Sequence, residues 1–239
     1  MSSNEPLLPP VAILAGGLAL RMRPLTDSQP KALLEIAGRP FVEHQLELLR
    51  RRGLRRVVLC IGYRAEAIEA RLGDGKALGL EVRYSRDGER LLGTAGALRR
   101  AAPLLGERFF VLYGDSYLDL DYAAVWAAAL REEKPALMTV YRNEGRLEAS
   151  NVLFEDGRLL AYDKRAPKPE MRHVDFGLAV LHASALERVP ADSPSDLADL
   201  YRSLAADGGL AGLEVSQRFY QVGSPEGLAE LRELLTRGS

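Results

Sequence analysis

The stretch VAILAGGLALRMRPLTDSQPK, residues 11–31, does most to decide the architecture of this chain. An apolar run, Val11–Leu14, is followed by the loop Ala15-Gly16-Gly17, and cations follow at Arg21 and Lys31. A short buried strand that opens into a glycine loop lets backbone N–H groups approach phosphate oxygens closely. Because Arg21 and Lys31 add positive charge, the stretch predicts a polyphosphate site at the end of the first strand.

Two other phosphate-binding loops are excluded by their spacing. A dinucleotide-binding loop has a third glycine that opens a helix and an acidic residue that ends the second strand. Here the second strand ends in Cys60-Ile61-Gly62-Tyr63, without a carboxylate. A Walker loop requires Gly-Lys followed by Ser or Thr, but the only Gly-Lys pair, Gly75-Lys76, precedes Ala77. The chain therefore fits neither a dehydrogenase nor a P-loop kinase.

Apolar runs alternate with segments of helical period along the rest of the chain, which is typical of an α/β fold. We expect a doubly wound, mostly parallel, Rossmann-like sheet over residues 11–120 and a smaller mixed sheet, laid against it, over residues 121–239. The expected strands span 11–14, 57–61, 80–84, 109–113, 136–141, 151–154, 159–162, 177–181 and 219–222. The expected helices span 42–52, 65–72, 94–105, 122–133 and 194–206, and Ser224 caps a closing helix.

Composition predicts one compact domain over residues 1–239, because 47% apolar residues suffice for one sizeable core. The net charge of −1 argues against nucleic acid as a partner, since duplex binding usually needs a basic excess. No apolar stretch reaches the roughly 18 residues of a spanning helix, so no membrane partner is expected. A cytoplasmic location is expected. Cys60, the only cysteine, lies in a strand-like run and is expected to be buried and unreactive.

Five motifs occur in order along the chain. They are LAGGLALRMRPLTDSQPKALLEIAGRP at 14–40, LGTAGA at 92–97, YGDS at 113–116, DK at 163–164 and VGSPE at 222–226. With these motifs the chain resembles the sugar-1-phosphate nucleotidylyltransferases (NDP-sugar pyrophosphorylases) over essentially its whole length.

The resemblance implies a reaction in which a sugar 1-phosphate oxygen attacks the α-phosphorus of a nucleoside triphosphate and pyrophosphate leaves. Mg²⁺ is the implied cofactor. The nucleophile is already an anion, so catalysis depends on charge neutralisation and positioning rather than on a general base.

The resemblance also implies roles for particular residues. Catalysis is assigned to Arg21, Lys31 and Asp115, and nucleotide binding to Leu14, Ala15, Gly16, Gly17, Gly93, Thr94, Ala95 and Gly96. Sugar-phosphate binding is assigned to Asn151, Lys164 and Asp175, and metal binding to Asp115 and Gln221. Asp115 also comes straight after the expected strand over 109–113 and Gly114, where a carboxylate suits Mg²⁺, although a turn-forming Asp is common at such a place. Thr94 could instead only cap the following helix, and Asn151 and Asp175 fit structural roles at a hairpin and a strand edge equally well.

Two positions depart from the pattern of that family. Leu20 stands before Arg21 where a hydroxyl residue is usual, which removes a group that would help to hold phosphate. Gln221 stands where an acidic residue is usual, and its amide oxygen can ligate Mg²⁺ but brings no charge. Both departures bear on turnover more than on fold.

The resemblance favours GTP with a mannose- or heptose-1-phosphate type of substrate, and a uridylyl- or cytidylyltransferase is the nearest alternative. A catalytically degenerate sensor of nucleotide sugars is a further alternative, which Leu20 and Gln221 support. A homo-oligomer is left open: apolar positions of the closing helix are expected in the core, with an interface as the alternative. These positions are Leu228, Leu231, Leu234 and Leu235.

Overall fold

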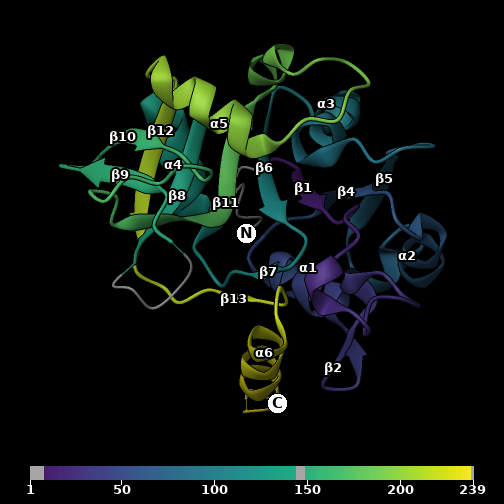
Figure 1. The fold of residues 1–239 in the computed structure, drawn as a ribbon. Helices are drawn as coiled ribbons and strands as arrows, with labels where there is room; N and C mark the ends of the chain where they lie inside the picture. Colours follow the sequence, from purple (N-terminus) through teal and green to yellow (C-terminus); the bar gives the residue numbers. More distant parts are fainter. Residues whose placement is uncertain (1–7, 144–148, 238–239) are drawn as a thin grey trace, which may run out of the picture.

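The computed structural model describes residues 8–143 and 149–237 (Figure 1). Four strands from the first half of the chain pair in parallel within the central sheet, in the order β6-β1-β4-β5. They are β1 (Val11–Leu14), β4 (Arg56–Ile61), β5 (Glu81–Arg86) and β6 (Arg108–Tyr113). Each lies within two residues of its predicted bounds, and the expected α/β fold with a doubly wound sheet is confirmed.

The second half does not form a separate sheet, and this part of the prediction is wrong. β11 (His173–His182) pairs antiparallel with β6, so the strands of the second half continue the first sheet to nine strands. β11 also pairs with β8 and β9, β8 pairs with β12, and β9 pairs with β10. These strands are β8 (Ala136–Arg142), β9 (Val152–Glu155), β10 (Arg158–Tyr162) and β12 (Leu210–Val215). The buried pattern of β6 permits a neighbour on each side, and periodicity alone does not show which strand takes the second position.

Helices cover both faces of the sheet, and the alternation of side chains along the strands sorts the core into two layers. On one face, Val11 and Ile13 pack with α1 (Phe41–Arg51), α2 (Ala65–Leu72) and α4 (Tyr122–Glu132). On the other face, Ala12 packs with α3 (Gly93–Leu105) and α5 (Leu197–Ala206). Figure 1 shows α3 and α5 side by side on this second face.

The closing helix α6 (Pro225–Arg237) stands apart from the sheet and packs on a third apolar cluster that includes Ile36 and Phe41 (Figure 1). Ser224 Oγ accepts the Gly227 N–H at 3.2 Å, as the predicted cap requires. Of its apolar positions, Leu228 and Leu231 are buried, Leu235 packs partly buried against the cluster and Leu234 is exposed. The expectation of a core position therefore holds for the first part of this helix.

Short elements complete the fold. The predicted strand over 219–222 is only two residues long, β13 (Tyr220–Gln221), and it pairs with β7 (Ser116–Tyr117) beside the main sheet. The remaining elements are β2 (Glu35–Ile36), β3 (Arg39–Pro40) and four 3-10 turns, η1 (Leu20–Met22), η2 (Lys31–Leu33), η3 (Lys76–Leu78) and η4 (Ala183–Arg188). Within the described ranges, no helix combines the length and the apolar character that crossing a membrane would require.

Candidate active site

The loop after β1 and the turn after β6 lie at one edge of the sheet. Parallel pairing places Leu14 opposite Tyr113, so Gly16-Gly17 and Gly114-Asp115 leave adjacent strands at the same level. The two segments touch closely: a Cβ on Gly114 would lie 2.4 Å from the Leu14 carbonyl oxygen. Only glycine allows this approach, which explains the residue that precedes Asp115.

Lys31 and Asp115 meet at this edge. Pro30 is extended and places Lys31 at the start of η2. Lys31 Nζ lies 2.7 Å from Asp115 Oδ2, and the two side chains are 21% and 28% exposed. The structure thus brings together a cation and a carboxylate that lie far apart in the sequence.

Two cavities open on either side of this ion pair. Besides the pair itself, both are lined by Ala19, Leu91 and Tyr113. The first cavity is also lined by expected nucleotide-binding residues, namely Leu14, Ala15, Gly16, Gly17, Gly93 and Thr94. The second is lined by Arg21, Lys164, Asp175 and Gln221, which were assigned to catalysis, the sugar phosphate and the metal. Lys31 and Asp115 therefore belong to the boundary that the two cavities share.

Arg21 and Leu20 line the second cavity and are exposed. Arg21 is exposed, and among the described residues no carboxylate forms an ion pair with it. Its charge is therefore available to an incoming anion. Leu20 is 58% exposed, and its isobutyl group offers no hydrogen-bonding atom to a ligand.

Ala95 and Gly96 are buried and do not line the first cavity, although the sequence assigned them to the nucleotide. Their amides face the Ser195 carbonyl oxygen, at 2.9 Å from Ala95 N and 3.4 Å from Gly96 N. The N–H groups of Ala95 and Gly96 are thus bonded within the protein rather than directed at a ligand.

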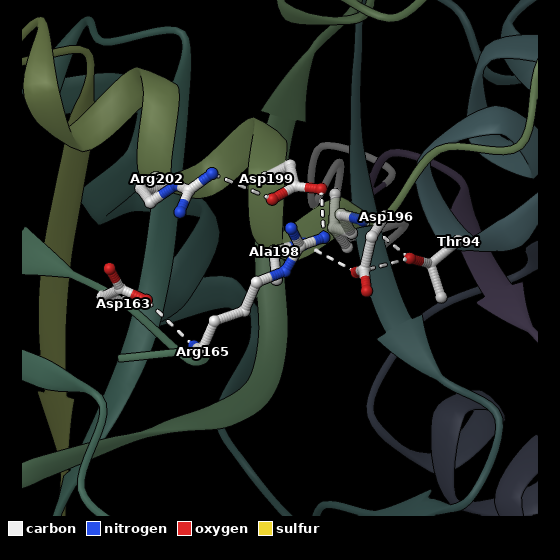
Figure 2. Close-up of polar contacts among 8 residues, drawn as sticks. Thr94, Asp163, Arg165, Asp196, Ala198, Asp199 and Arg202 are labelled. Atoms are coloured by element: carbon white, nitrogen blue, oxygen red, sulfur yellow. Dashed lines mark hydrogen bonds and ion pairs between the residues drawn. The ribbon is translucent and has the colours of Figure 1, made fainter. Parts of the chain in front are cut away.

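Thr94, in the first turn of α3, also contacts the start of α5 (Figure 2). Its Oγ1 accepts the N–H of Leu197 at 2.7 Å and donates to Asp196 Oδ1 at 3.2 Å. Asp196 in turn caps α5 by accepting the Ala198 N–H. Thr94 therefore caps α5, not the following helix α3, and it also lines the first cavity.

The segment around Lys164 is attached to α5 as well. Asp163 Oδ1 accepts the N–H groups of Arg165 and Ala166, both at 2.9 Å, and this forms the turn that presents Lys164. Arg165 then pairs with Asp199 of α5 at 2.6 Å (Figure 2). One helix is thus bonded both to the wall of the first cavity and to the lysine segment of the second.

Asp175 and Asn151 take different places. Asp175 lines the second cavity, and its Oδ1 accepts the Gly177 N–H at 2.9 Å. Tyr113 OH is 3.4 Å from Asp175 Oδ2, and burial, together with this carboxylate, raises the pKa of Tyr113 well above its ordinary value. Asn151 is 2% exposed, does not line the cavity, and accepts the Asp175 N–H at its Oδ1. Asn151 therefore binds the backbone of Asp175 and does not itself face the cavity.

The residues present fit a magnesium ion that is shared with substrate. A Cβ on Gly223 would lie 3.7 Å from both Asp115 Oδ2 and Gln221 Oε1, so these two oxygens face the same small space. Within the described residues there is no group of three His, Cys, Asp or Glu side chains that could enclose a metal. Mg²⁺ commonly binds through one or two protein oxygens plus substrate phosphates and water, which matches this donor set.

Asp87 is a site residue that the sequence analysis missed. It lines the first cavity, is 5% exposed, and its Oδ2 accepts the Leu92 N–H at 3.1 Å. Burial raises the pKa of this carboxyl group above its ordinary value of 3.8. Asp87 directly follows β5, so the rule that selected Asp115, a carboxylate just past the end of a strand, could have found it.

The comparisons with known proteins agree with this geometry. A model of the nucleotidyl transferase family matches residues 11–150, and the chain belongs to this family. The catalytic subunit beta of mannose-1-phosphate guanylyltransferase from Drosophila pseudoobscura pseudoobscura is 32% identical over 219 residues. That match covers 90% of this chain but 59% of the Drosophila protein, so the chain spans about three fifths of that relative's length.

Two further matches span nearly the whole chain. N-acetylmuramate alpha-1-phosphate uridylyltransferase from Neisseria meningitidis serogroup B is 30% identical, with 93% of this chain and 96% of the relative covered. Among solved structures, HddC from Yersinia pseudotuberculosis complexed with GMP-PN has a TM-score of 0.79 at 21% identity. The match covers 95% of this chain and all of HddC, and it supports the fold.

Proposed function

We propose that the chain transfers a nucleotidyl group from a nucleoside triphosphate to a sugar 1-phosphate. A phosphate oxygen of the sugar forms a bond to the α-phosphorus, the bond from the α-phosphorus to the bridging oxygen breaks, and pyrophosphate leaves with the electron pair. The observation on which the proposal rests is the Lys31–Asp115 pair at the boundary of two cavities. A nucleotide in the first cavity and a sugar phosphate in the second would meet beside it.

The main obstacle to this reaction is repulsion between two polyanions, and the proposed roles follow from it. Lys31 would lie beside the α-phosphorus and would neutralise charge that develops there. Arg21, exposed at the second cavity, would bind the phosphates that leave. Asp115 and Gln221 would hold Mg²⁺, which when bound supplies positive charge to the phosphate oxygens.

We propose GTP as the nucleotide because Asp87 lies in the first cavity. Guanine has two adjacent donors, N1–H and the 2-amino group, and a buried carboxylate accepts such donors well. The similarity to mannose-1-phosphate guanylyltransferase supports the same base. Uridylyl transfer is the second candidate, because the Neisseria uridylyltransferase matches over 96% of its length.

For the second substrate we propose a mannose- or heptose-1-phosphate type of sugar. Lys164 is exposed at the second cavity and would bind its phosphate, while Asp175 would accept hydroxyl hydrogens of the sugar ring. Asn151 would contribute indirectly by holding the Asp175 backbone.

The experiment is a panel of GTP, UTP, CTP, ATP and dTTP, each combined with several sugar 1-phosphates and Mg²⁺, with pyrophosphate release as the readout. Release with GTP and a mannose- or heptose-type phosphate is expected, and release only with UTP would favour the second candidate. Intact nucleotide binding without release for any pair would contradict catalysis and would favour a sensor.

A further inference from the structure

A helix residue outside both cavities contacts the turn that presents Asp115. Gln45 lies in α1, is 1% exposed, and lines neither cavity. Its Nε2 donates to the carbonyl oxygen of Ser116 at 2.7 Å and to that of Tyr113 at 3.3 Å. These two carbonyls flank Gly114 and Asp115, so a single amide group bridges both ends of the turn.

The orientation of this amide follows from its neighbours. Both neighbours are carbonyl oxygens, which only accept, so the nitrogen of Gln45 must face them. Its Oε1 is then buried without a donor among the described residues. A buried acceptor without a donor lowers stability, so packing gives no reason for an amide at this position. The hydrogen bonds that Nε2 donates to the turn give such a reason.

Two backbone hydrogen bonds hold the turn from other directions. The Gly114 N–H donates to Leu14 O at 3.0 Å, and the Val222 N–H donates to Asp115 O at 2.8 Å. The register of β7 with β13 also pairs Ser116 with Gln221. Because Gln45 fixes the Ser116 carbonyl, it acts on the backbone next to both expected metal ligands.

We propose that Gln45 is a positioning residue for Asp115: its amide fixes the turn so that the carboxylate faces Lys31 and Gln221. The inference rests on the proposed function, because it requires that Asp115 holds a divalent cation together with the nucleotide. Partners of metal ligands usually affect metal affinity strongly even though they never touch the metal.

Manganese binding, followed by electron paramagnetic resonance with a non-hydrolysable GTP analogue, tests this directly, because Mn²⁺ accepts the same oxygen ligands as Mg²⁺. Gln45→Met keeps the length of the side chain but removes the donor. We expect its affinity for Mn²⁺ to fall by about 10- to 100-fold. Gln45→Asn, whose shorter amide cannot bridge both carbonyls, serves if Gln45→Met does not fold, with the same direction expected.

The control is Leu49→Ala in the same helix. Leu49 is fully buried in the core beneath the sheet, so its truncation lowers stability without touching the turn. We expect Leu49→Ala to lower the melting temperature and to keep the Mn²⁺ affinity of the natural protein. Equal losses of affinity in Gln45→Met and Leu49→Ala would overturn the inference, because general destabilisation would then explain both.

Failure of the role of Gln45 and failure of the proposed metal site would give different results. Unchanged Mn²⁺ affinity in Gln45→Met, with normal binding by the natural protein, would overturn the role of Gln45 alone. Absence of Mn²⁺ binding by the natural protein in the presence of the analogue would overturn the metal site of the proposed function, and the role of Gln45 with it.

Discussion

Single side chains at the site come from segments that are distant in sequence, and the sheet brings them together. Lys31 and Asp115 are separated by 84 positions, yet Nζ and Oδ2 are 2.7 Å apart because β1 and β6 are parallel neighbours. Lys31 was predicted from its spacing after the glycine loop and Asp115 from its place after a strand, whereas their contact was not predicted. Under the proposed function, this short ion pair would hold the lysine in place until phosphate oxygens compete for it.

Removing the lysine charge tests its role at this scale. Lys31→Met is expected to lower kcat for pyrophosphate release by about 10²- to 10³-fold, as loss of one charge-stabilising group in a transition state usually does. The control is Lys76→Met, which breaks another Lys–Asp pair at 2.7 Å, with Asp74, on the exposed surface. Equal kcat values for the two variants would contradict a role for Lys31 in the reaction.

Asp87 gives a prediction that combines stability with binding. Burial raises the pKa of the Asp87 carboxyl group in the folded protein above its ordinary value of 3.8. The stability that this pKa shift contributes is fully present below pH 3.8 and is lost as pH rises through the pKa of the folded protein. Asp87→Asn keeps an oxygen for the Leu92 N–H but has no charge to bury. We expect it to melt at a higher temperature than the natural protein near pH 7, with the difference vanishing below pH 3.8.

The same variant is expected to raise the KM for GTP by about tenfold, since a charged acceptor for guanine is replaced by a neutral one. The KM for UTP serves as the control and is expected to change less. An unchanged KM for GTP would remove the support that Asp87 gives to guanine.

At the scale of elements, the region between α3 and α5 links the two cavities. Ser195 O, just before α5, accepts two amides of α3. Thr94 of α3 and Asp196 accept the first N–H groups of α5 (Figure 2), so the starts of the two helices are bonded to each other's surroundings. Gly93 is required here: its φ is +69°, and a Cβ would lie 2.6 Å from Ser195 O. The LGTAG motif thus has a packing role that its sequence does not reveal.

Thr94→Val removes the acceptor of the Leu197 N–H at the start of α5 while keeping the shape of the side chain, and Asp196 still caps the helix. Loss of one such hydrogen bond typically costs about 1 kcal/mol, so we expect the melting temperature to fall by roughly 2–4 °C in a chain of this size. Thr236→Val, at an exposed position of α6, is the control and is expected to change stability by less than about 0.5 kcal/mol. Identical melting temperatures for the two variants would show that the contact adds nothing to stability.

Comparing particular elements with their predicted bounds shows what the local sequence can and cannot predict. The bounds of β1 and α2 follow from local apolar periodicity and agree with the structure. The pairing of β11 with β6 and the direction of the Thr94 hydroxyl depend on which segments meet in space, and no local pattern encodes that. For the same reason Asp115 was found by its position after a strand, while Gln45, which acts from a helix across the fold, was not.

At the scale of the whole molecule, one continuous sheet places a glycine loop, two cavities and a lysine–carboxylate pair along one edge. The first cavity is built by the first half of the chain, and the second cavity takes residues from both halves. Residues 11–120 and 121–239 are therefore proposed as a nucleotide half and a sugar-phosphate half of one domain.

The most direct test of this account is the mass of the product formed from GTP and a mannose- or heptose-type 1-phosphate with Mg²⁺, compared between the natural protein and Asp115→Asn. We predict a GDP-sugar and pyrophosphate from the natural protein and a rate lower by about 10²-fold or more in the variant. No nucleotide sugar from any tested pair, or equal rates for the two proteins, would contradict it.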